Sequence, residues 1–70
     1  MIDYDNKQMS DYIDQYIHSE RDRKVLKLRL LDNVKFDSIA EQMNYSPRHI
    51  KRIYYKAVHE LFRMINEYQK

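Results

Sequence analysis

Apolar residues recur along this chain with the period of an α-helix. Near the beginning of the sequence they follow the spacing i, i+3, i+4, i+7 and i+8, which lines one face of a helix. These residues are Met9, Tyr12, Ile13, Tyr16 and Ile17. A second periodic segment, residues 21–31, has a broad apolar face. That face is made of Val25, Leu26, Leu28, Leu30 and Leu31.

Polar residues predict where the helices begin and end. Ser19 is suited to cap the second helix, and Asp37 to cap a short third helix over residues 38–43. Asn33 and Asn44 are the residues best able to adopt a left-handed backbone conformation at the two connections that follow. The chain has no glycine, which strand hairpins commonly need at positive φ, so an all-α fold is favoured.

The last helix is predicted to begin at Ser46-Pro47 and to run to about Tyr68. Serine at the cap accepts an amide hydrogen bond, and proline at the first helical position loses nothing by lacking an N–H. At 1.5 Å per residue this helix would be about 33 Å long. We therefore expect residues 1–70 to form one small domain of four helices.

Residues 36–57 have the pattern of a helix-turn-helix, in which two helices meet at a short turn. Ala40 falls where the helices cross closely, and Asn44 falls at the turn. The positions expected to face inward are Ile39, Met43, Tyr45, Ile50 and Ile53. The whole predicted core comprises Ile13, Tyr16, Ile17, Val25, Leu26, Leu30, Ile39, Ala40, Met43, Ile50, Ile53, Ala57 and Leu61.

The outward face of the last helix is basic. Arg48, Arg52, Tyr55 and His59 share one stripe, and Lys51 and Lys56 flank it. An ordinary solvated helix would carry acidic residues four positions away, yet residues 44–57 contain none. The second helix of a helix-turn-helix enters the major groove of DNA, so this face predicts contact with double-stranded DNA.

The side chains of this face suit different parts of DNA. Arg48 and Arg52 can each bind the O6 and N7 atoms of guanine through two hydrogen bonds. Contacts to the DNA backbone are assigned to the remaining polar side chains and to the amides at the helix start. These backbone candidates are Ser46, His49, Lys51, Tyr55 and Lys56.

The segment "FDSIAEQMNYSPRHIKRIYYKAVHEL" resembles region 4 of bacterial sigma factors, the domain that reads the −35 promoter element. The resemblance covers about residues 23–61. It extends to small phage and mobile-element regulators of the ArpU and RinA-like type, which carry only this domain. It implies that base readout falls on Pro47, Arg48 and Arg52, and that RNA polymerase is a further partner. No segment resembles the part that binds the −10 element, so we expect a regulator rather than a complete sigma factor.

The charge is divided unevenly along the chain. Residues 1–20 have a net charge of −4 and residues 21–70 have a net charge of +6, within a total of +2. Such a division suggests a polyanionic partner for the basic part, although the two parts could instead attract each other within the fold. The acidic segment also leaves open an adaptor or inhibitor that docks on RNA polymerase or another regulator without reading DNA.

One further surface is predicted on the last helix, beside its buried stripe. It consists of Val58, Phe62, Ile65 and Tyr68. If this face is uncovered it indicates a partner, most simply a two-fold homodimer that reads half-sites about 34–36 Å apart. The alternative is that the first helix folds back and covers it.

Other functions find little support in the sequence. His49 and His59 would lie about 15 Å apart along one helix, and His18 has no ligand spacing to either, so we expect no metal and no other cofactor. Asp11 and Asp14 lack a nucleophile or basic partner, so we expect no enzyme. There is no cysteine, no run of about 20 apolar residues and no basic, apolar leader at the beginning. We therefore expect a cytoplasmic protein without a membrane span.

Overall fold

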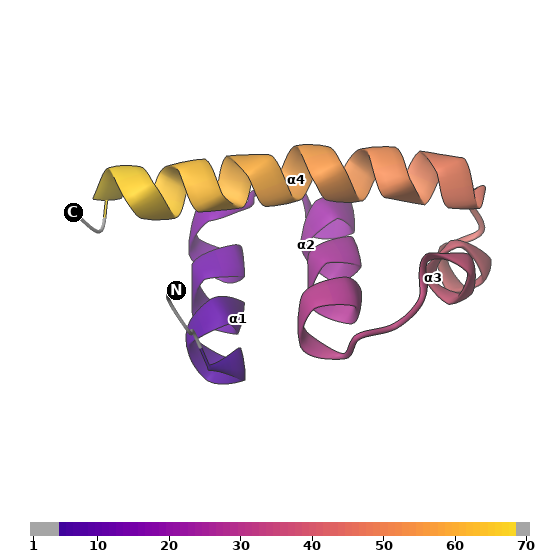
Figure 1. The fold of residues 1–70 in the computed structure, drawn as a ribbon, viewed down its shortest axis with the longest axis horizontal. Coiled ribbons are helices and arrows are strands. Elements are labelled where there is room, and N and C mark those ends of the chain that lie inside the picture. The colour runs from indigo at the N-terminus through magenta and orange to yellow at the C-terminus, as the bar shows by residue number, and fades with distance from the viewer. Residues whose placement is uncertain (1–4, 69–70) are drawn as a thin grey trace.

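The computed structural model describes residues 5–68, in which one long helix lies across three shorter ones (Figure 1). The helices are α1 (Asn6–Tyr16), α2 (Glu20–Leu26), α3 (Phe36–Met43) and α4 (Pro47–Tyr68). Helix α1 packs under the C-terminal half of α4, α2 under its middle and α3 under its N-terminal end. The predicted all-α fold with a long C-terminal helix is confirmed.

Helix α2 continues directly into η1 (Lys27–Leu31), a short π-helical segment. The amide of Asp32 donates to the carbonyl of Lys27 at 3.2 Å, which is the i→i+5 bond of a π turn. Asn33 follows with a φ of 56°, so the left-handed connection predicted there is confirmed. No sequence signal marked the wider turn.

The core consists of two apolar clusters, and α4 contributes to both. The first lies between α1, α2 and the C-terminal half of α4, and contains Ile13, Tyr16, Ile17, Leu26, Ala57, Leu61 and Ile65. The second lies between α2, α3 and the N-terminal half of α4, and contains Val25, Ile39, Ala40, Ile50 and Ile53. Tyr54 packs against both clusters. The predicted core is confirmed except for Leu30 and Met43, which are half-buried.

The predicted start of α3 was wrong. The helix begins at Phe36 with Lys35 as its N-cap, and no side chain caps it. Phe36 packs against the second cluster, and this contact stabilises a helix that already includes Phe36, the residue before Asp37. Asp37 lies in the first turn, where its negative charge interacts favourably with the positive end of the helix dipole. By contrast, the hydroxyl of Ser19 caps α2 as predicted, by accepting from the amide of Asp22 at 3.3 Å.

Tyr45 was expected to face inward, and that prediction was also wrong. Its side chain is 37% exposed, and its ring meets the ring of His49 edge-on at 4.8 Å. The preceding residue, Asn44, has a φ of 62°. This left-handed residue turns the chain away from the core before Tyr45 is reached.

The predicted partner surface on α4 is covered only in part, since Phe62 and Tyr68 are 38% and 63% exposed. Ile65 is only 1% exposed because α1 packs over it, so its assignment to an uncovered surface was wrong. Val58 is half-buried against the same cluster, and the ring of Tyr68 stacks on that of Tyr16 at 6.0 Å. The alternative, in which the first helix folds back, therefore holds for Ile65 and in part for Val58. The homodimer stays a prediction.

Among residues 5–68, no helix is both long enough and apolar enough to cross a membrane.

The close approach of α3 and α4 can be tested at Ala40, which is 2% exposed. We expect Ala40→Leu to overpack the second cluster and to lower the free energy of unfolding by about 1–3 kcal/mol. Chemical denaturation followed by circular dichroism measures this. Gln42→Leu on the exposed side of α3 is the matched control and should change little. An unchanged midpoint for Ala40→Leu would show that the helices do not cross at this residue.

Candidate nucleic-acid interface

The connection between α3 and α4 is a three-residue turn, residues 44–46. Asn44 closes α3 in the left-handed conformation, and the amide of Tyr45 donates to the carbonyl of Ala40 at 2.9 Å. Beyond the turn, Ile50 and Ile53 pack against Ile39 in the second cluster. These contacts fix the start of α4 relative to α3, as a helix-turn-helix requires.

The start of α4 is capped as predicted. The hydroxyl oxygen of Ser46 accepts a hydrogen bond from the amide of His49 at 3.1 Å, and Pro47 is the first helical residue. Pro47 has no N–H and the amide of Ile50 donates to the carbonyl of Ser46 at 3.0 Å, so the amide of Arg48 is left to point out of the helix end, where the dipole is positive. The end of the helix is therefore suited to an anion.

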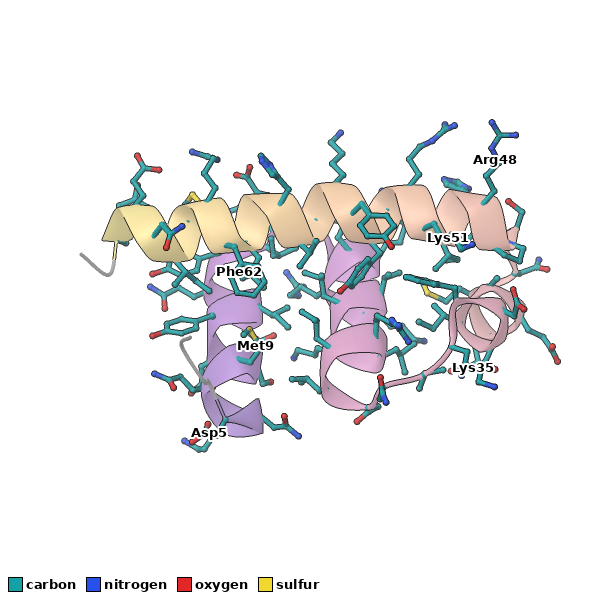
Figure 2. The ribbon with its side chains drawn as sticks, in the orientation of Figure 1. Asp5, Met9, Lys35, Arg48, Lys51 and Phe62 are labelled. Carbon is teal, nitrogen blue, oxygen red and sulfur yellow. The ribbon has the colours of Figure 1, made fainter. Side chains whose placement is uncertain are left out.

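The first three turns of α4 present basic side chains to solvent. Arg48, Lys51, Arg52 and Lys56 are all exposed. Figure 2 shows Arg48 projecting from α4 on the side away from α2 and α3. Within residues 5–68, no acidic side chain lies within salt-bridge distance of these four residues. This end of the helix therefore has a positive charge that the fold does not neutralise.

The C-terminal half of α4 is different. The guanidinium of Arg63 pairs with Glu60 at 2.7 Å and with Glu67 at 3.1 Å. The hydrogen bond from Arg63 lowers the pKa of Glu60, so the pair stays ionised at neutral pH. The cation in the C-terminal half of α4 is therefore neutralised by neighbouring carboxylates, whereas the cations at its N-terminal end are not.

The structure brings several predicted site residues together. Ser46, Arg48, His49 and Arg52 line one open polar hollow at the start of α4. Two of these residues were predicted to read bases and two to contact the DNA backbone. Tyr55 is 59% exposed one turn further along the helix. Pro47 and Lys56 are exposed as well.

An aromatic group that the sequence did not predict lies beside this face. The ring of Tyr54 meets Phe36 edge-on at 5.3 Å and Tyr55 edge-on at 5.1 Å. Burial raises the pKa of Tyr54, so its hydroxyl stays protonated well above neutral pH. The guanidinium of Arg29, from η1, lies 4.7 Å from the centre of the Phe36 ring. The only signal for Arg29 was one basic residue within the apolar run 28–31.

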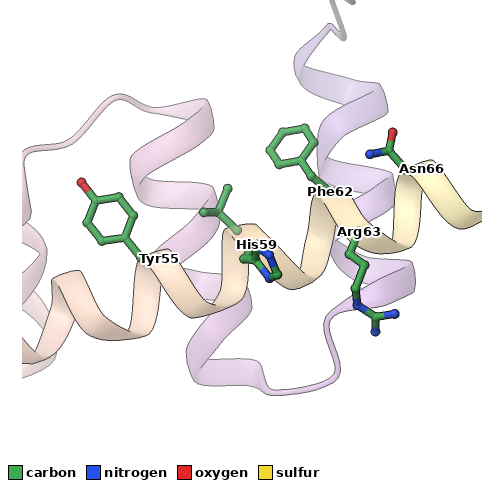
Figure 3. A pocket seen from close by; sticks show the side chains of 6 residues that line it. Tyr55, His59, Phe62, Arg63 and Asn66 are labelled. Atoms are coloured by element: carbon green, nitrogen blue, oxygen red, sulfur yellow. The ribbon is translucent and has the colours of Figure 1, made fainter.

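An open groove runs along α4 next to Tyr55 (Figure 3). Its lining residues are Tyr55, Val58, His59, Phe62, Arg63 and Asn66. Phe62 is 38% exposed, so part of the predicted partner surface remains open here.

The described part of the acidic segment, residues 5–20, lies away from the basic face. Helix α1 packs on η1 and on the C-terminal half of α4, at the opposite end from Arg48 (Figures 1 and 2). Its carboxylate Asp14 pairs with Lys27 at 2.7 Å. Attraction between the two differently charged parts of the chain is therefore present, but residues 5–20 leave the start of α4 uncovered. No group of three acidic, histidine or cysteine side chains in the described residues could hold a metal ion.

Comparison with known proteins agrees with this geometry. The family model described as "Sigma-70, region 4" matches residues 19–63, which run from the cap of α2 through most of α4. No curated protein and no solved structure matches the chain.

The cap at the start of α4 gives a prediction for stability. Replacing Ser46 by alanine removes the acceptor for the amide of His49, and should lower the free energy of unfolding by about 1 kcal/mol. Ser38→Ala inside α3 is the matched control, and it should be neutral or slightly stabilising because alanine favours a helix. Thermal denaturation of both variants measures the difference. Equal melting temperatures would show that Ser46 does not act as a cap.

Proposed function

The chain belongs to the sigma-70 region 4 family, whose members are DNA-binding helix-turn-helix domains, and we propose that it is a sequence-specific regulator of transcription. The N-terminal half of α4 enters the major groove of double-stranded DNA. The observation that carries this proposal is the row of exposed cations at the start of α4, which no acidic side chain of residues 5–68 compensates.

Base readout rests on Arg48 and Arg52. They are four residues apart on α4, and at 1.5 Å per residue their Cα atoms are separated by about 6 Å along the axis. Base pairs follow each other every 3.4 Å or so, so the two guanidinium groups reach bases about two steps apart. Each can bind one guanine through two hydrogen bonds. Pro47 lies at the first helical position, where its ring offers only an apolar contact to a base edge.

Contacts to the backbone surround this readout. The hydroxyl of Ser46 and the amide of Arg48 bind one phosphate, while Lys51 and Lys56 approach the strands on the flanks of the helix. His49 and Tyr55 add hydrogen-bond donors. Cation contacts of this kind supply affinity and fix the orientation of α4, whereas the two arginines supply specificity.

A second candidate function is that of an adaptor that docks on RNA polymerase or on another regulator. Sigma region 4 domains bind both DNA and RNA polymerase. The groove that runs from Tyr55 to Asn66 favours this candidate, because it keeps the aromatic side chain of Phe62 exposed in the C-terminal half of α4, beyond Arg48 and Arg52. Both candidates act without a catalytic step or a cofactor, and both place the protein in the cytoplasm beside the DNA.

Salt dependence separates the two candidates. If about four to six phosphates are neutralised, a plot of the logarithm of the association constant against the logarithm of salt concentration should have a slope of roughly −4 to −5. Fluorescence anisotropy with a labelled duplex selected from a random pool measures it. No binding to any duplex at low salt, together with capture of the protein by RNA polymerase, would leave only the adaptor.

A substitution tests the readout. We expect Arg52→Ala to weaken binding to the preferred duplex by about 1–3 kcal/mol and to reduce the difference between preferred and random duplexes. Arg63→Ala is the matched control, because it removes the same charge from an exposed position that is already paired with Glu60 and Glu67. A loss of equal size in both variants would mean that net charge alone determines binding.

A further inference from the structure

The ring of Phe36 has two cations over it that come from different parts of the chain. The guanidinium carbon of Arg29, in η1, lies 4.7 Å from the ring centre, and the ammonium nitrogen of Lys51, in α4, lies 5.9 Å from it. Attraction between a cation and an aromatic face extends to about 6 Å. Arg29 is therefore held well within this range and Lys51 at its outer end.

The ring itself is fixed by its neighbours. Phe36 is the first residue of α3 and packs against the second cluster. Tyr54 meets it edge-on at 5.3 Å, and the ring of Tyr55 lies at 6.2 Å. A ring restrained on these sides offers a defined position to a cation.

Arg29 is also held by a hydrogen bond. One of its terminal nitrogens donates to the carbonyl of Val34 at 3.3 Å. A guanidinium has five N–H donors, so this bond leaves others for a ligand. Within residues 5–68, neither Arg29 nor Lys51 lies within salt-bridge distance of an acidic side chain. Two positive groups that share one ring without a counter-charge form a site for an anion.

The location of this pair relative to α4 indicates which anion. Lys51 lies on the side of α4 nearer α3, whereas Arg48 projects away from the other helices (Figure 2). The pair therefore lies beside the base-reading stripe rather than on it. If α4 occupies the major groove, the DNA strand at the edge of that groove lies beside α4. The phosphates of this strand are then the groups nearest to Arg29 and Lys51.

We propose that Phe36 is a positioning residue, whose ring holds Arg29 and Lys51 where together they bind phosphates of one DNA strand. The proposal rests on the proposed DNA binding and extends it to Arg29, a residue outside the helix-turn-helix. The aromatic ring contributes no charge of its own. It limits the positions of two cations that would otherwise repel each other, so that less conformational freedom is lost when phosphate binds.

Substitution of the ring tests this role. Phe36→Leu keeps an apolar side chain but removes the aromatic face, and should weaken duplex binding about two- to fivefold for each cation released. Phe36→Tyr keeps the face and should bind within about twofold of the unchanged protein. Tyr12→Leu is the matched control, because it removes an aromatic ring from α1, where it packs against the first cluster, and should leave the affinity unchanged. Circular dichroism at the temperature of the binding assay verifies that each variant is folded.

A double-mutant cycle separates positioning from a purely structural effect. In a protein that already carries Arg29→Met and Lys51→Met, the ring has no cation to hold, so Phe36→Leu should have no further effect on affinity. A loss as large in that background as in the unchanged protein would overturn the proposal, as would equal affinities of the unchanged protein and Phe36→Leu.

A measurement without DNA distinguishes the failure of this proposal from failure of the proposed function. In the NMR spectrum, protons of the Arg29 side chain should be shifted upfield by the ring of Phe36, and the shift should disappear in Phe36→Leu. If the shift is present but the unchanged protein binds no duplex, the DNA function fails and the phosphate role fails with it. If the protein binds duplex but the shift is absent, only the role of Phe36 is overturned.

Discussion

Burial of one stripe along α4 is the constraint on which the rest of the structure depends. Its residues follow each other at intervals of three or four positions and all lie in the core: Ile50, Ile53, Ala57, Leu61 and Ile65. Burying one such large aliphatic side chain contributes about 1.5–3 kcal/mol. Helices α1, α2 and α3 each cover part of this stripe, so α4 contributes to both apolar clusters. Since a helix has two sides, burial of one stripe also determines which side chains remain outside, and these are the cations at its start.

Much of this could be predicted from the sequence, because the signals are local. Serine before proline, asparagine after an apolar stripe and helical spacing each act within a few residues, so the bounds of α4 and the left-handed Asn33 and Asn44 follow directly. The exposure of Arg48 and Arg52 follows in the same way from the position of the buried stripe. Roles on DNA depend on a partner, and the periodicity of the chain alone does not fix them.

What could not be predicted depends on contacts between distant segments. Ile65 is buried only because α1 returns across α4, and a helical pattern does not reveal which helix covers which face. Tyr45 has the spacing of a core residue, but the left-handed turn before it changes its direction. The approach of Arg29 to Phe36 joins η1 to α3, and neither residue has an unusual neighbour in sequence. Local rules therefore fail where tertiary contacts decide.

The left-handed asparagines have a consequence for the unfolded chain. Glycine would adopt a positive φ without strain at positions 33 and 44, but it would also give the unfolded chain many more conformations. Asparagine accepts some strain in the native state and keeps the disordered ensemble smaller. In a chain of 70 residues with no glycine at all, this restriction applies at every position. The turn between α3 and α4 is thus closed without glycine, and fewer unfolded conformations compete with the folded arrangement of the two helices.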